Sequence, residues 1–135
     1  MTPPLLLDTD TLSAVMKTHP KVVSIGRTYL RNHGQFTFSA ITRFELLRGL
    51  IVKNATRQVV IFESLCATSV ILDITDSIIV KAANIYADLH RQGLLIGDAD
   101  ILIAATALVH GYGVATNNQR HFRRIAGLHL ENWLL

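Results

Sequence analysis

The chain has 135 residues, of which 50% are hydrophobic, and its formal net charge is +3 at pH 7. This length predicts a single domain over residues 1–135. No apolar run approaches the ~20 residues of a membrane helix, and the first residues lack the charged and apolar regions of a secretory signal peptide, so we expect a cytoplasmic protein. The single cysteine, Cys66, excludes an internal disulfide.

The predicted elements alternate between strands and helices. In chain order they are a strand ending at residue 8, a helix over 8–17, a strand over 36–39, a helix over 40–52, a helical stretch over 56–66, a strand over 69–74, a helix over 75–92, a helix over 98–111, a strand over 113–116, a loop or short helix over 117–125 and an edge strand over 128–133. This alternation predicts an α/β fold with a parallel sheet, helices on both faces and a site beyond the carboxyl ends of the strands.

Several residues mark where the predicted helices begin, end and face the core. Ser39 is expected to start the helix over 40–52. Thr75 or Asp76 would start the helix over 75–92, and Gly93 would end it. The helix over 40–52 is expected to bury an apolar stripe made of Ile41, Phe44, Leu47 and Ile51.

Four carboxylates lie where hydrophobic sequence stops: Asp8, Glu45, Asp98 and Asp100. The chain has only ten Asp and Glu residues, and a solvated surface would not place so many beside Leu- and Ile-rich runs. Carboxylates within about 4 Å of each other repel by ~4 kcal/mol at an effective dielectric near 20, so a cluster needs a neutralising cation. Oxygen ligands favour Mg²⁺ or Mn²⁺. The six histidines lack the spacing of a zinc motif, and we assign them no chemistry.

Structural explanations compete with the metal role of the aspartates. Asp8 could cap the helix that follows it, but Asp10 or Ser13 could do so instead, which favours a metal role for Asp8 and a capping or supporting role for Asp10. Asp98 follows a glycine and is the natural cap of its helix. Asp100 lies inside the first turn of an apolar helix, where an unpaired acid is costly, so Asp100 is the better ligand.

Glu45 has two explanations that its spacing does not separate. Thr42 to Glu45 fits the S/T-x-x-E capping box, and Arg48 lies three residues on for an ordinary helical ion pair. If Ser39 starts the helix, however, Glu45 lies at the edge of the buried stripe, where an acid needs a partner.

Four motifs occur in a fixed order from Leu5 to Trp133. They are DTDTLS after the first strand, S-x-I-T-x-x-E-L-x-x-G, GDADILIAATAL, and A-T-N-N-x-x-H-F with R-I-A-G-L to close. In this order they resemble the PIN-domain ribonucleases, specifically the VapC-type toxins of prokaryotic toxin–antitoxin pairs. The resemblance implies a PIN-like three-layer α/β/α fold with a central, mostly parallel sheet.

The resemblance also implies specific site residues. The acids of catalysis and cation binding would be Asp8, Asp100 and Glu45, with Glu45 acting directly or through water, and Asp98 as an auxiliary acid. Residues that would support them by hydrogen bonds are Asp10, Thr116 and Asn118. Where many PIN domains have a fourth acid, this chain reads Thr-Asn-Asn from residue 116, which weakens the case for a second cation.

The function implied is that of an Mg²⁺- or Mn²⁺-dependent endoribonuclease, which hydrolyses phosphodiester bonds in structured RNA such as tRNA or rRNA. The family further implies a homodimer and a cognate VapB-type antitoxin that occludes the site. The basic residues expected to contact RNA phosphates are Arg43, Arg48, Arg120, Arg123 and Arg124.

Two other functions compete with this one. A catalytically inactive PIN-like module that binds RNA or protein is favoured by the missing fourth acid and disfavoured by the three acids that remain, because bare carboxylates repel phosphate. A receiver-like phosphoacceptor domain would use Asp8, Asp10 and Asp73. It is disfavoured because no lysine follows Lys81.

Overall fold

The computed structural model describes residues 3–135, which form five strands and seven helices around one sheet. In chain order these are β1 (Leu5–Leu7), α1 (Thr9–Met16), α2 (Pro20–His33), β2 (Thr37–Ser39), α3 (Ala40–Val52), α4 (Thr56–Ala67), β3 (Val70–Leu72), α5 (Asp76–Gln92), α6 (Asp98–His110), β4 (Gly113–Ala115), α7 (Gln119–Phe122) and β5 (Leu130–Glu131). None of these helices has the length and apolarity to span a bilayer.

The sheet is parallel throughout, with the strand order β3-β2-β1-β4-β5. The chain first builds outward from β1 through β2 to β3. It then crosses to the other side of β1, where β4 pairs with it in the register Leu6 to Val114. The direction of winding therefore reverses between β1 and β4, and such a switch point opens a crevice beyond the carboxyl ends of the two strands. The predicted parallel α/β fold is confirmed.

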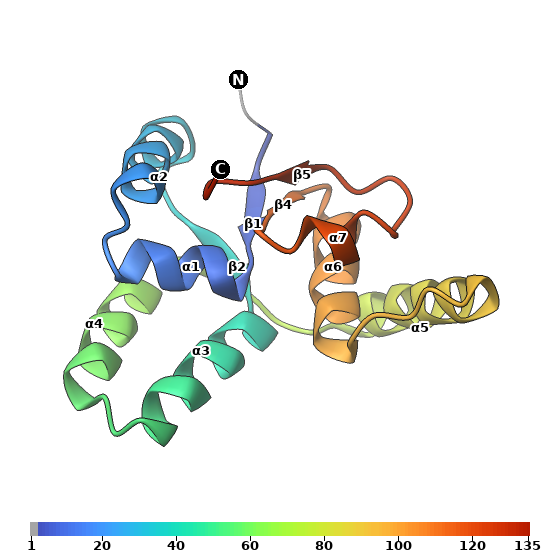
Figure 1. Ribbon diagram of the computed structural model, residues 1–135, viewed down its shortest axis with the longest axis horizontal. Helices are drawn as coiled ribbons and strands as arrows, with labels where there is room; N and C mark the ends of the chain where they lie inside the picture. The colour runs from blue at the N-terminus through green and yellow to red at the C-terminus, as the bar shows by residue number, and fades with distance from the viewer. Residues whose placement is uncertain (1–2) are drawn as a thin grey trace.

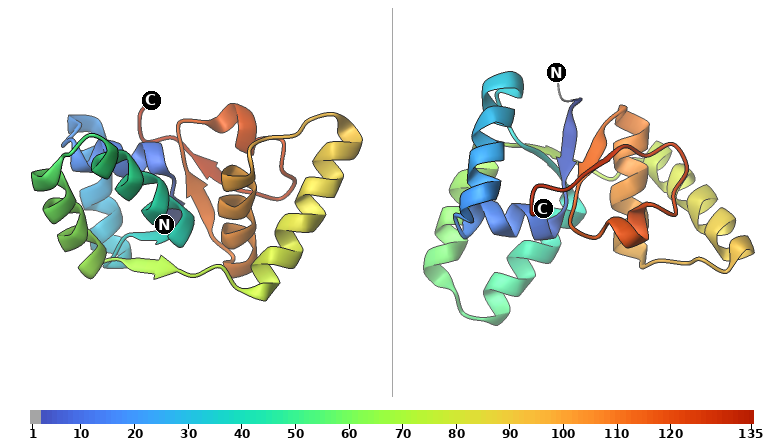
Figure 2. Two further views of the ribbon diagram at one scale, coloured as in Figure 1. Left: turned by 90° about the horizontal axis from the view of Figure 1, so that it is seen from below. Right: turned by 45° about the horizontal axis from the view of Figure 1, so that its top comes forward.

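Helices cover both faces of the sheet, as Figures 1 and 2 show, and one apolar cluster lies on each face. Successive side chains of a strand point to opposite faces, so the completely buried Leu5 and Leu7 pack with α1 to α4, whereas Leu6 packs with α5, α6 and α7. Every residue of β1 is thus buried in one of the two apolar clusters. The arrangement is the expected three-layer α/β/α sandwich.

Helix α2 was not anticipated from the sequence. Pro20 occupies its first turn, where a missing N–H costs nothing, and Gly34 ends it with a positive φ of 82°. Its buried Tyr29 accepts a hydrogen bond from the Leu5 N–H at 2.9 Å. The same ring packs near Trp133, 5.7 Å between centroids, so α2 joins the first strand to the C-terminal segment.

The buried face of α3 differs from the predicted stripe. Phe44 and Ile51 are each 58% exposed, whereas Thr42 and Leu46 are buried. The prediction assumed one core on one side of the helix. In the structure α3 contacts the apolar clusters on both faces of the sheet, with Ile41 packed against one and Leu46 within the other.

Gly113 allows the close approach of β4 and the segment before β5. A Cβ at this position would lie 2.9 Å from the His129 carbonyl oxygen and 3.0 Å from Leu5 Cδ2. Because backbone cannot yield cheaply, we expect Gly113→Ala to lower the free energy of unfolding by about 1 to 3 kcal/mol. Urea denaturation measures this. Gly49→Ala, in α3 with nothing within 4 Å of its Cβ, is the control and should not destabilise; equal stability of the two variants would contradict the prediction.

Candidate active site

Asp8 lies at the switch point, directly after β1. Its backbone N–H donates to the Ala115 carbonyl at 2.9 Å, which continues the pairing of β1 with β4. Its buried carboxylate accepts the Thr9 N–H at Oδ1 and the Thr116 hydroxyl at Oδ2, both at 2.8 Å. Strands β1 and β4 therefore deliver Asp8 and Thr116 to the same point.

Asp8 is itself the N-terminal cap of α1. It has the extended backbone of a cap, φ −75° and ψ 164°, and the Thr9 N–H bonds to its side chain. The prediction that Asp10 or Ser13 would cap this helix and leave Asp8 free was wrong. The helix begins at Thr9, so both candidates lie inside it, where they cannot adopt the conformation of a cap. Capping occupies only Oδ1 of Asp8.

The ionised form of the acids in the crevice is energetically unfavourable. Burial, and next the charge of Asp10, raises the pKa of Asp8 from 3.8 to about 7, and the charge of Asp100 adds to the same effect. Burial likewise raises the pKa of Asp10, opposed by the Asn117 N–H, which donates to Asp10 Oδ2 at 3.0 Å. Both shifts mean that negative charge is unfavourable here without a neutralising partner.

Asp100 joins the site through the segment that follows β4. The Asn118 backbone N–H donates to Thr116 Oγ1 at 2.9 Å, and the Asn118 side-chain amide lies 3.5 Å from Asp100 Oδ2. A chain of hydrogen bonds therefore runs from Asp100 through Asn118 and Thr116 to Asp8. The predicted supporting residues Thr116 and Asn118 occupy the positions between these two acids.

Glu45 reaches the site from α3. Its Oε1 accepts the Thr9 hydroxyl at 2.8 Å, and Thr9 also donates its backbone N–H to Asp8. Thr9 thus links the two acids. Arg48 lies 3.8 Å from the other oxygen of Glu45. Ser39 caps α3, as predicted, by accepting the Ile41 N–H, so the capping box from Thr42 does not form.

Asp98 has a different environment from Asp100. Gly97, not Asp98, is the N-cap of α6, and no side chain bonds there, so the prediction of an Asp98 cap was wrong. Asp98 is the first residue of the helix and is exposed. Among the hydrogen bonds of the described residues, none joins Asp98 to the other acids. Its auxiliary role remains a prediction.

His121 also belongs to the site, although no chemistry was assigned to it from the sequence. Its Nδ1 lies 3.3 Å from Asp100 Oδ2 and 3.0 Å from Asn118 Nδ2. The available signal was the N-x-x-H spacing on a possible short helix, since residues three apart share a helical face. Only the fold shows that this face meets α6.

The donor set suits a divalent cation. Within residues 3–135, no group of three or more His, Cys, Asp or Glu side chains is arranged so that it could hold a metal ion. Mg²⁺ is commonly held by one or two carboxylates and several waters, and Asp8 and Asp100 supply such oxygens. The raised pKa of Asp8, caused partly by its acidic neighbours, fits a place where a cation removes the charge.

The five predicted RNA-contacting arginines occupy different environments. Arg43 forms an ion pair with Glu63 of α4, and Arg124 donates to the carbonyls of Leu94 and Leu95, both at 3.2 Å. Arg48 lies over the Phe44 ring, 4.9 Å from its centroid. Arg120 lies in α7 and Arg123 directly follows it, and both residues are exposed.

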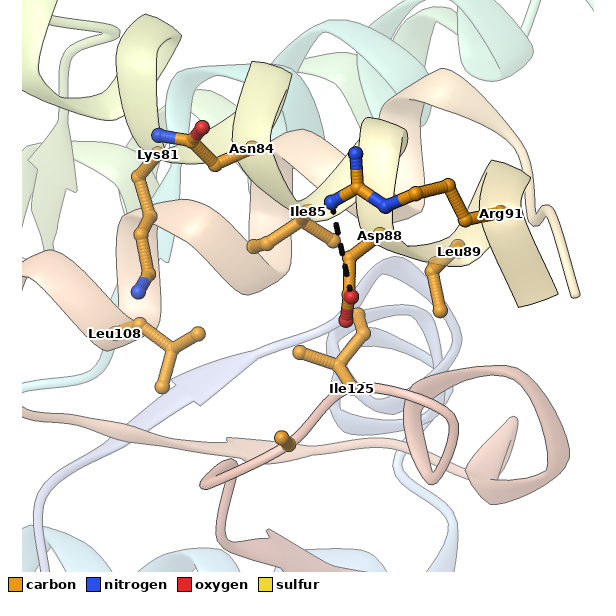
Figure 3. A pocket seen from close by; sticks show the side chains of 9 residues that line it. Lys81, Asn84, Ile85, Asp88, Leu89, Arg91, Leu108 and Ile125 are labelled. Carbon is orange, nitrogen blue, oxygen red and sulfur yellow. Dashed lines mark ion pairs between the residues drawn. The ribbon is translucent and has the colours of Figure 1, made fainter.

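Two cavities differ in their relation to the acids. One of about 340 Å³ lies between α1, α3 and α4 and includes Thr9 and Glu45 in its wall. Another of about 270 Å³, shown in Figure 3, lies between α5, α6 and the loop at Ile125, with Lys81 at one end and the Asp88–Arg91 ion pair at the other. None of the predicted site residues lines the second cavity, so only the first adjoins the site.

The fold and the site define a three-layer α/β protein with carboxylates at the switch point of a parallel sheet. The chain belongs to the PIN domain family, whose sequence model matches residues 5–128. It is 35% identical over 130 residues to Ribonuclease VapC2 of Haemophilus influenzae, covering 96% of this chain and 97% of the relative. Against the tRNA(fMet)-specific endonuclease VapC of Salmonella typhimurium, identity is 32% over 129 residues, with coverage of 95% and 96%.

Comparison with solved structures supports the same family. A chain in the crystal structure of DNA-bound VapBC from Salmonella typhimurium superimposes with a TM-score of 0.87 at 31% identity, covering 98% of this chain and 99% of that one. The resemblance to the PIN-domain, VapC-type proteins expected from the four motifs is therefore confirmed, along the whole length over which the motifs occur.

Proposed function

We propose that this protein is an endoribonuclease that depends on Mg²⁺ or Mn²⁺ and is the toxin of a VapBC-type pair. The observation that carries the proposal is the hydrogen-bonded connection of Asp8 with Asp100 and Glu45 at the switch point. It is supported by relatives of matching length that are named ribonuclease and tRNA(fMet)-specific endonuclease. The substrate class is structured RNA, with tRNA favoured and rRNA second.

In the proposed reaction a water oxygen bonds to phosphorus, a bridging P–O bond breaks, and the leaving oxygen takes up a proton. Asp8 and Asp100 would hold the divalent cation, with Thr116 fixing Asp8 Oδ2. When bound, the cation lowers the pKa of water and neutralises charge on the phosphoryl oxygens. Glu45, held by the Thr9 hydroxyl, would orient the attacking water and accept its proton.

The basic side chains beside the acids would place the RNA. Arg120 and Arg123 are exposed and lie on either side of His121 in the sequence, and His121 contacts Asp100. Within residues 3–135 neither arginine forms an ion pair, so they would contact phosphates without first breaking one. Arg43 would first have to leave Glu63. We therefore assign the stronger RNA contacts to the α7 arginines.

The proposed partners are a VapB-type antitoxin and a second copy of the chain. The matching crystal structure is of a DNA-bound VapBC complex. A protein partner would bury the exposed apolar side chains on α3 and α4. These are Phe44, Ile51, Val52, Val60 and Ile61. Action on cellular RNA together with an antitoxin would place the protein in the cytoplasm.

Incubating purified protein with total cellular RNA tests the proposal. We expect discrete cuts with Mg²⁺ or Mn²⁺, none with EDTA, and none from Asp8→Asn under any condition. Asp73→Asn is the matched control: it changes an exposed acid between β3 and α5 and should cut like the wild type. Intact RNA after incubation with folded, antitoxin-free wild type would instead favour the inactive PIN-like binding module.

A further inference from the structure

His121 is held rigidly beside Asp100. It lies on α7, a short helix anchored by the completely buried Phe122 and followed by the buried Ile125. The His121 backbone N–H donates to the Asn118 carbonyl at 3.3 Å. The backbone of His121 therefore has a fixed place relative to Asn118, whose own backbone N–H donates to Thr116 Oγ1.

The contacts of His121 and Asn118 converge on one oxygen of Asp100. His121 Nδ1 lies 3.3 Å and Asn118 Nδ2 3.5 Å from the same atom, Oδ2, and the two nitrogens lie 3.0 Å apart. Hydrogen bonds to one oxygen of a carboxylate fix the orientation of its plane. Oδ1 of Asp100 is then the oxygen that remains available to a ligand.

Two other histidines, His129 and His90, have different surroundings. His129 pairs with Glu131 at 2.8 Å but is 53% exposed and lies before β5. His90 stacks against Tyr86 on α5. His121, in contrast, contacts an acid proposed to bind the cation. The exposed fraction of the side chain is 22% for Asp100 and 40% for His121, so the contact is partly sheltered from solvent.

We infer that His121 is a positioning residue, which donates its Nδ1–H to Asp100 Oδ2 and so holds the carboxylate in the orientation that binds the divalent cation. In this tautomer Nδ1 does not accept from the Asn118 amide, which is left to donate to Asp100. The inference rests on the proposed function, in which Asp100 is a ligand. Residues that orient a metal ligand typically contribute 10- to 100-fold to metal affinity. The imidazole edge facing solvent, which carries Nε2, is not needed for this role.

Isosteric substitutions separate the two nitrogens. Asparagine places a polar atom where Nδ1 lies, whereas glutamine places one near Nε2. We expect Mn²⁺ affinity, measured by isothermal titration calorimetry, to fall about 10-fold or more in His121→Leu and His121→Gln and to stay within about twofold of wild type in His121→Asn. His90→Leu is the control and should bind as wild type does. Melting curves in EDTA verify that each variant is folded.

RNA cleavage at saturating Mn²⁺ gives a second readout. Extra cation should restore most of kcat in His121→Leu without changing KM for RNA, because the RNA contacts are untouched. Wild-type affinity in His121→Leu would overturn the inference alone. Normal affinity in all variants with impaired cleavage in His121→Asn but not His121→Gln would assign the role to Nε2 and also overturn it. A wild type that neither binds Mn²⁺ nor cuts RNA would contradict the proposed function itself.

Discussion

Asp8→Asn is expected to make the cation-free protein more stable at pH 8 while destroying its activity. The pKa of Asp8 is raised from 3.8 to about 7 by burial and acidic neighbours. The folded state therefore favours the protonated carboxyl, and its contribution to stability is complete below about pH 4 and is lost as the pH rises through about 7. Three pKa units correspond to about 4 kcal/mol. Asparagine cannot ionise and keeps a cap acceptor for Thr9.

Chemical denaturation in EDTA between pH 4 and 8 measures this effect. The free energy of unfolding of the wild type should fall steadily as the pH rises from 4 to 8. That of Asp8→Asn should fall much less. The remaining fall has the sign expected from the raised pKa of Asp10. Asp98→Asn alters an exposed acid of α6 and should keep the wild-type slope. A wild type whose stability is independent of pH over this range would contradict the pKa shift.

The same destabilisation should be reversed by a divalent cation. Ligand that binds only the folded state raises the free energy of unfolding by RT ln(1 + [L]/Kd), about 2.7 kcal/mol at 100 times Kd. Mn²⁺ should therefore raise the Tm of the wild type at pH 8 and should leave Asp8→Asn unchanged. At pH 5 the effect should shrink, because protons then occupy the carboxyl that the cation needs.

Asp100→Asn is expected to reduce kcat/KM for RNA by about 10³-fold, whereas Asp98→Asn should reduce it by less than about threefold. A 10³-fold loss corresponds to about 4 kcal/mol of transition-state stabilisation, the scale on which a cation acts. Both acids lie in the first turn of α6 and lose the same interaction with the helix dipole. Only Asp100 touches Asn118 and His121.

Initial-rate cleavage of a defined RNA, with both variants at equal concentration, checks this pair. Thermal melts verify that both variants are folded, so that the loss of activity is not a loss of folded protein. Equal losses of activity would assign the effect to the helix terminus. A larger loss in Asp98→Asn would exchange the roles that we give to the two acids.

The elements that could be predicted are those fixed by local chemistry. Thr75 caps α5 by accepting the Ile78 N–H, and Gly93 ends the helix in the left-handed region. Ser39 likewise caps α3. These features follow from single residues and their immediate neighbours. The parallel sheet, and the placement of Asp8 and Thr116 at the ends of their strands, followed from the alternation of strands and helices. The order of the strands did not.

What could not be predicted depends on contacts distant in sequence. Helix α2 has an apolar stripe at helical spacing, made of Val22, Ile25, Tyr29 and Leu30, so its existence could have been predicted. Its packing near Phe36 and Trp133 could not. The exposed Phe44 faces solvent because α3 is shared by two clusters. His121 enters the site only because α7 packs near α6, which no spacing along the chain reveals.

The backbone on both sides of the site is part of the sheet ladder. The Asp8 N–H bonds to Ala115 and the Thr116 N–H bonds to Glu131, each at 2.9 Å. Their amide hydrogens should exchange with deuterium only when the central strands separate, which is the slowest opening a domain has. The backbone that carries Asp8 and Thr116 therefore cannot rearrange without opening the centre of the sheet. These two side chains are held in place before any ligand or partner arrives.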